Sequence, residues 1–154
     1  MHGLVGQQLQ GFTGQPILAR PGGAQAYIQT QVSSRSPLEL VVMLYEGLIR
    51  FTGEARGAIE RHDLAAKRAA MSRALAIVSE LQSTLNMAEG GELAASLDNL
   101  YTYINGRLLD ASMQNVIEPL DETLKLVATL RDAWSEIANR EIVEGGSPGA
   151  PPRP

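Results

Sequence analysis

The chain contains no cysteine, only two histidines and few aromatic residues. Without cysteine it cannot form disulfides, thiolate nucleophiles or cysteine-ligated zinc and iron–sulfur centres. His2 and His62 alone give little basis for metal binding or proton transfer. The formal charge of −4 argues against a general nucleic-acid binder, because contact with phosphates requires a basic surface. We also see no signal peptide and no apolar run near the roughly 20 residues of a membrane helix, so we expect a cytoplasmic protein.

Glycine and proline are frequent overall, with 15 and 8 residues, but they concentrate at the two ends of the chain. Eight of them fall in residues 1–23 and seven fall in the last ten residues. Both ends hold too little apolar material to offset their chain entropy. We therefore expect a disordered arm over 1–23, one domain over 24–143, and a disordered tail over 144–154.

The body of the chain predicts an all-α, antiparallel four-helix bundle with a short N-terminal cap segment. Apolar residues recur at helical spacing, and no segment alternates with the period of a strand. The first helix opens with a capping box formed by Ser36 and Glu39, with Pro37 at the first helical position. The expected helices run from about Pro37 to Arg61, Leu64 to Asn86, Glu92 to Ser112, and from an Asn115 cap to Glu141, with a break at Glu89-Gly90-Gly91.

The first helix has apolar residues on two faces when each residue advances about 100°. One face is the expected core stripe of Leu38, Val41, Val42, Tyr45, Leu48 and Ile49. The second face is the strip of Leu40, Leu44, Gly47, Phe51 and Ala58, with Met43 between this strip and the polar side. We interpret this strip as a binding surface that the bundle does not need, the alternative being a helix covered on all sides. Residues 24–34, with Tyr27, Ile28 and Val32, are its expected weak cover.

Patterns for catalysis and for cofactors are missing, so we expect no enzyme and no metal. No Glu-x-x-His pair is present for a di-iron bundle, and Gly90-Gly91 lacks the Lys and Ser/Thr of a phosphate loop. His62 falls at a predicted turn, which weakens the alternative of a histidine phosphotransfer bundle. A homodimeric structural bundle, using the strip on a second copy, is the other alternative.

Several short motifs resemble the FliS family of flagellar export chaperones, in order and at matching spacing over about 24–139. The first helix and the segment before it contribute Ala26-Tyr27, Gln31-Val32, Ser36-Pro37-Leu38-Glu39-Leu40, Met43-Leu44-Tyr45-Glu46-Gly47 and Phe51. Later matches are Ser83-Thr84-Leu85-Asn86, Gly90-Gly91-Glu92, Leu100-Tyr101-Thr102-Tyr103, Arg107-Leu108-Leu109, Asn115, Glu118-Pro119-Leu120 and Trp134. The arm before Ala24 and the proline-rich tail are not features of that family.

The resemblance implies a chaperone that binds the C-terminal segment of flagellin in apolar grooves, prevents its premature polymerisation and delivers it to the flagellar type III export gate. It implies no cofactor, no nucleic acid and no membrane insertion, with a co-chaperone or a second copy as further partners. It also assigns Tyr27, Ile28 and Val32 to a cap that contacts the export gate. The expected flagellin-binding residues are Leu40, Met43, Leu44, Gly47 and Phe51 from the first helix, and Tyr103 and Arg107 from the family pattern.

Overall fold

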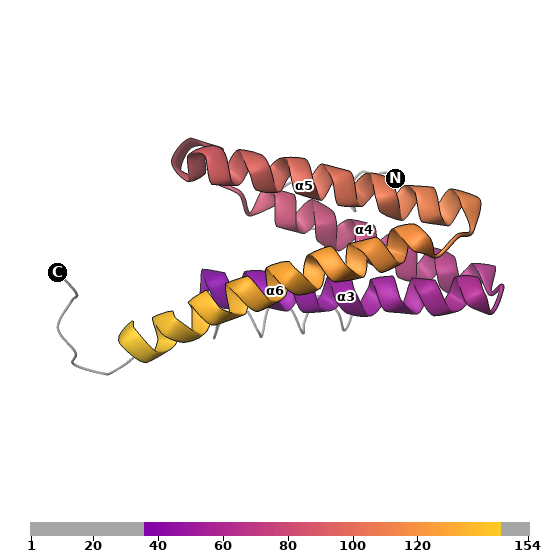
Figure 1. Ribbon diagram of the computed structural model, residues 1–154, viewed down its shortest axis with the longest axis horizontal. Helices are drawn as coiled ribbons and strands as arrows, with labels where there is room; N and C mark the ends of the chain where they lie inside the picture. The colour runs from indigo at the N-terminus through magenta and orange to yellow at the C-terminus, as the bar shows by residue number, and fades with distance from the viewer. Residues whose placement is uncertain (1–35, 146–154) are drawn as a thin grey trace, which may run out of the picture.

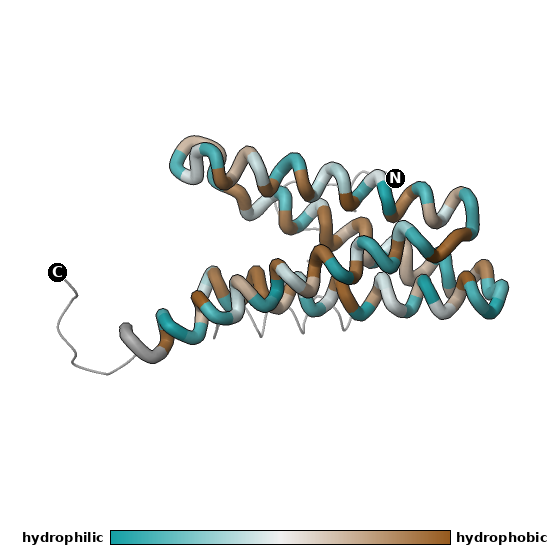
Figure 2. The backbone as a smooth tube through the Cα atoms, in the orientation of Figure 1, coloured by the Kyte–Doolittle hydropathy of each residue, from teal (hydrophilic) through white to brown (hydrophobic). Residues whose placement is uncertain are grey.

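The computed structural model describes residues 36–145. The expected arm lies outside these residues, as do the expected cap segment with Tyr27, Ile28 and Val32 and most of the tail. The described chain forms four helices: α3 (Pro37–Glu60), α4 (Leu64–Ser83), α5 (Met87–Gln114) and α6 (Glu118–Gly145). Figure 1 shows an elongated antiparallel bundle, and in Figure 2 apolar positions recur along every helix. The predicted all-α four-helix bundle is confirmed. Within this part of the chain, no helix has the length and apolar character needed to cross a membrane.

The first two helices begin at the caps that the sequence predicts. The Ser36 Oγ accepts the Glu39 backbone N–H at 3.1 Å, and the Glu39 carboxylate accepts the Ser36 N–H at 2.9 Å. Asp63 caps α4 by accepting the Ala66 N–H at 3.0 Å. Each cap satisfies a backbone donor that the first turn of a helix leaves unpaired, which explains why these local signals are reliable.

The later boundaries differ from the predicted ones. Helix α4 ends at Ser83, and Asn86 caps the start of α5 by accepting the Glu89 N–H at 3.0 Å. The break expected at Gly91 is a kink within α5, where this glycine has φ +56°. Asn115 ends α5 in the left-handed conformation, with φ 55°, and does not start α6. Asparagine suits both a helix start and a left-handed helix end, so its side chain alone does not distinguish the two.

Helix α3 packs against both α4 and α6, and this uses both of its apolar faces (Figure 1). A methyl group at Gly47 would lie 3.0 Å from the Ile77 Cδ1 of α4, so the two helices approach closely there. Leu44 and Ala58, both on the strip, are only 3% and 0% exposed. The interpretation that the bundle does not need the strip is therefore wrong for Leu44 and Ala58, whereas Leu40, Met43 and Phe51 are only partly buried.

Two buried threonines differ in how their hydroxyl groups are paired. Thr52 on α3 is fully buried, and its Oγ1 has no hydrogen-bond partner among the residues that the structure describes. Thr123 on α6 is 1% exposed, and its hydroxyl donates to the Pro119 carbonyl at 2.9 Å. The pair is a matched test of what an unpaired polar group costs in this core.

Thr52→Val should raise the free energy of unfolding by about 1 kcal/mol, because an unpaired buried hydroxyl costs about 1–3 kcal/mol and valine has nearly the same shape. Thr123→Val, which removes a paired hydroxyl, should lower it by up to about 1 kcal/mol. Urea unfolding followed by far-UV circular dichroism measures both changes. Equal effects, or the reverse order, would contradict this assignment.

Candidate functional site: an apolar pocket at one end of the bundle

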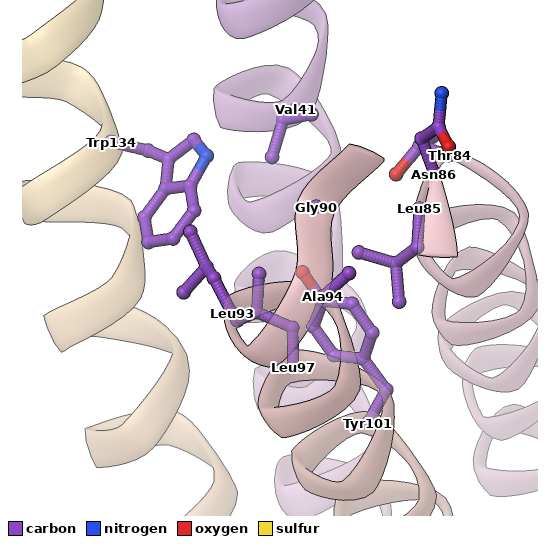
Figure 3. Close-up of a pocket in the computed structure, with 10 residues that line it drawn as sticks. All are labelled: Val41, Thr84, Leu85, Asn86, Gly90, Leu93, Ala94, Leu97, Tyr101 and Trp134. Carbon is purple, nitrogen blue, oxygen red and sulfur yellow. The ribbon is translucent and has the colours of Figure 1, made fainter. Parts of the chain in front are cut away.

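An apolar pocket lies at the end of the bundle where α3 and α5 begin; we refer to it as the end pocket. Its volume is about 190 Å³. Residues of α3, α5, α6 and the connection between α4 and α5 surround it in Figure 3, and its lining comprises Val41, Thr84, Leu85, Asn86, Gly90, Leu93, Ala94, Leu97, Tyr101 and Trp134. Small-molecule sites usually occupy about 300–1,000 Å³. The end pocket is therefore better suited to one or two apolar side chains of a peptide than to a cofactor.

The kink at Gly91 shapes the wall of the end pocket. A methyl group at Gly90 would lie 2.6 Å from the Ala94 Cβ, so the turn before the kink can fold back only because this residue is glycine. Beyond the kink, Leu93 is 60% exposed although it continues the apolar stripe of α5. An exposed leucine beside an apolar pocket is ready for contact with a partner, because its burial would remove apolar surface from water.

Tyr101 lines the end pocket and is hydrogen-bonded to Tyr45, which lies in the core. The hydroxyl groups of Tyr45 and Tyr101 lie 2.6 Å apart, and these residues are 0% and 2% exposed. Trp134 packs edge-on against Tyr45, with ring centroids 6.1 Å apart. Burial raises the pKa of both phenols, and the hydrogen bond with Tyr101 raises the pKa of Tyr45 further. Both groups are neutral at physiological pH, so the pocket offers apolar contact over an uncharged, paired base.

The five expected binding residues of α3 do not line the end pocket. Leu44 is buried in the core and Gly47 lies against Ile77. Leu40, Met43 and Phe51 are partly buried. The guanidinium groups of Arg50 and Arg73 lie 4.6 and 5.7 Å from the centre of the Phe51 ring. We call this surface, at which Leu40, Met43 and Phe51 stay partly exposed, the α3–α4 seam.

The other two expected residues, Tyr103 and Arg107, meet on a different seam, between α5 and α6. The Tyr103 hydroxyl donates to Glu122 at 2.6 Å, and the Arg107 Nε donates to the same carboxylate at 2.8 Å. These bonds lower the pKa of Glu122, with the tyrosine contributing most, and raise that of Tyr103. Sequence reasoning missed Glu122, because only the register of the two helices places it opposite the pair.

The sequence alone also does not indicate that Leu93, Leu97 and Trp134 lie around an opening, although Leu97 is itself part of the core. Their helical spacing is that of core residues, and only the lack of covering helices at this end distinguishes them. The adjacent Gly90-Gly91 break was the one signal that the packing changes here.

Residues with catalytic or metal-binding potential do not gather in the described structure. Between residues 36 and 145, no three His, Asp or Glu side chains are grouped so that they could hold a metal ion. His62 is exposed in the turn after α3, with φ 60°, as the sequence predicts. A turn position of this kind differs from the mid-helix position that a phosphotransfer histidine requires.

Comparison with known proteins gives one consistent result. The family model described as "Flagellar protein FliS" matches residues 21–141. The flagellar secretion chaperone FliSB of Pseudomonas aeruginosa is 35% identical over 115 residues, covering 75% of this chain and 91% of that protein. The flagellar secretion chaperones FliS of Campylobacter jejuni and Salmonella typhimurium are 37% and 34% identical, covering 77% and 75% of this chain and 92% and 86% of their own lengths.

Tyr101→Phe should lower the free energy of unfolding by about 1–3 kcal/mol, because it leaves the Tyr45 hydroxyl buried without a partner. The double variant Tyr45→Phe/Tyr101→Phe should recover part of this loss, since neither hydroxyl then remains. Urea unfolding of the two single variants and the double variant completes the cycle. Strictly additive losses would show that the two hydroxyls do not depend on each other.

Proposed function

Because the chain belongs to the FliS family of flagellar secretion chaperones, we propose that it binds the C-terminal segment of flagellin in apolar grooves and delivers it to the type III export gate. Family membership makes it a chaperone of flagellum assembly and protein export, not an enzyme. The observation that carries the binding proposal is the end pocket, where Leu93 and Trp134 border an apolar opening.

The proposed mechanism is recognition of a peptide that folds as it binds. An amphipathic segment would insert apolar side chains into the end pocket and continue along the seams, as helices do in apolar grooves. Ordering a disordered ligand consumes about 2–5 kcal/mol of the gross contact energy, which favours a complex that can be released for export. While bound in the cytoplasm, the flagellin segment could not polymerise.

The proposed contact residues comprise the end pocket and both seams. Leu40, Met43 and Phe51 belong to this set because each keeps an exposed part, and Tyr103 and Arg107 because they border the α5–α6 seam. Leu44 and Gly47 would not contact the peptide and would instead stabilise the packing beneath the α3–α4 seam.

We propose that the segment with Tyr27, Ile28 and Val32 covers apolar surface in the absence of flagellin and contacts the export gate. Its position in the chain supports this, because it precedes Ser36, and Val41 of the end pocket lies in the second turn of α3. A cover of this kind would also limit self-association and leave the pocket available to a stronger ligand.

Leu93→Asp should weaken binding of a synthetic peptide with the C-terminal sequence of flagellin about tenfold or more, equivalent to about 1.4 kcal/mol. The charge would have to be desolvated on entering the apolar contact. Isothermal titration calorimetry measures the affinity. Met113→Asp is the matched control, because Met113 is a 78% exposed apolar residue of the same helix outside the end pocket. Unchanged affinity of the Leu93 variant would exclude the end pocket as the binding site.

Deleting residues 1–34 should leave the bundle folded and raise affinity for the same peptide, because the cover would no longer compete. Circular dichroism checks the fold, and calorimetry and light scattering measure affinity and self-association. If the truncated chain unfolds, residues 1–34 are part of the structure and do not act as a removable cover.

A further inference from the structure

A second pocket lies at the opposite end of the bundle, at the turn between α3 and α4; we call it the turn pocket. Its volume is about 250 Å³, and it is bordered by Ile59, His62, Asp63, Leu64, Lys67 and Asn115, among others. Helix α5 ends against the same space, since Asn115 is its C-terminal cap. The turn pocket shares no residue with the end pocket, and its lining is more polar.

The decisive feature of the turn pocket is the buried ammonium group of Lys67. This residue is 7% exposed, and its Nζ donates to the Ser112 carbonyl at 2.8 Å and to the Asn115 Oδ1 at 2.7 Å. Both acceptors are neutral, and Lys67 forms no ion pair with a carboxylate of residues 36–142. An ammonium has three donors, so one remains available. The last carbonyls of α5 offset only part of its charge.

The one acidic side chain at the turn pocket is already engaged elsewhere. The Asp63 Oδ1 accepts the Ala66 N–H at 3.0 Å, and its Oδ2 faces Arg61 at 4.0 Å. Asp63 therefore stabilises the start of α4 and does not pair with Lys67. Its negative charge nevertheless lies near the pocket, and it would repel a doubly charged phosphate more than a singly charged ligand.

Other lining residues complement the charge of Lys67. Ile59 and Leu64 offer apolar surface, with Leu64 51% exposed. The exposed His62 imidazole adds a hydrogen-bonding group beside the turn. The turn pocket thus offers a cation with a free donor beside an apolar wall. A carboxylate attached to a short aliphatic chain has the charge and the apolar surface that suit these two features.

We propose that the turn pocket binds a carboxylate of this kind, paired with the Lys67 Nζ, as found at the C-terminus of a peptide or in an acidic side chain. Buried charge is unfavourable unless it is paired, so a carboxylate entering here gains an ion pair that residues 36–142 do not supply. The site is separate from the proposed flagellin contacts and does not depend on them.

The test is a titration of the full-length, ¹⁵N-labelled protein with butyrate and, separately, with butyramide, its uncharged isostere. Butyrate should cause saturable shifts at residues 62–64 and at the Asn115 side chain, and butyramide should bind at least about tenfold more weakly, or about 1.4 kcal/mol. Equal binding of the two probes, or no saturable shift with butyrate, would overturn the proposal.

Lys67→Met keeps the apolar stem and removes the charge, so it should abolish the butyrate shifts. Lys125→Met, which alters the only other lysine of the chain at an exposed position of α6, should leave them unchanged. If the Lys67 variant fails to fold, the comparison of butyrate with butyramide on the unaltered protein still decides. Butyrate binding retained by a folded Lys67→Met variant would refute the assigned ion pair.

Two short peptides then separate the sources of the carboxylate. One ends in leucine with a free C-terminus, and the other has an internal glutamate and an amidated C-terminus. Binding of the first alone identifies a chain terminus, and binding of the second identifies an acidic side chain. Failure of both peptides would overturn the proposal that a peptide carboxylate is the ligand.

Discussion

The close approach of α3 and α4 at Gly47 is the contact on which the rest of the structure depends. With only a hydrogen at this position, the Ile77 side chain of α4 can lie against the α3 backbone. Leu44 and Ala58 of the strip are buried, as are Tyr45 and Leu48 of the other apolar face of α3. Both apolar faces of α3 therefore contribute residues to the core.

An open apolar surface lies at the end of the bundle where α3 and α5 begin. There α5 kinks at Gly91, and Leu93 extends beyond its covering helices. Beneath it, Tyr45 and Tyr101 satisfy each other's hydroxyl groups, so the surface below the opening is both neutral and paired. Such a surface recognises apolar groups with little electrostatic selectivity, which suits a chaperone that must bind and later release an unfolded segment.

The two ends of the bundle have different chemistry for a physical reason. At the α4–α5 end, the Asn86 cap satisfies a backbone donor with a neutral side chain, and apolar residues surround the opening. At the α3–α4 turn, the C-terminus of α5 attracts a cation. The buried Lys67 ammonium group is this cation, and it donates to the Ser112 carbonyl of α5. Because the acceptors around the buried Lys67 charge are neutral, this end of the bundle can pair with an anion. The α4–α5 end has no such charge at its pocket.

The helices and their first caps follow from local signals in the sequence, and only the tertiary structure decided which apolar faces are covered. Ser36, Glu39 and Asp63 act within one turn, so their roles do not depend on the rest of the fold. The family motifs are likewise short and ordered along the chain, and they indicate a chaperone without reference to packing. Periodicity shows that Leu44 and Leu93 are apolar positions of their helices, but their 3% and 60% exposure depends on how near the neighbouring helix lies. An apolar stripe along one helix shows which residues can be buried. The packing of the neighbouring helices determines which of them are buried.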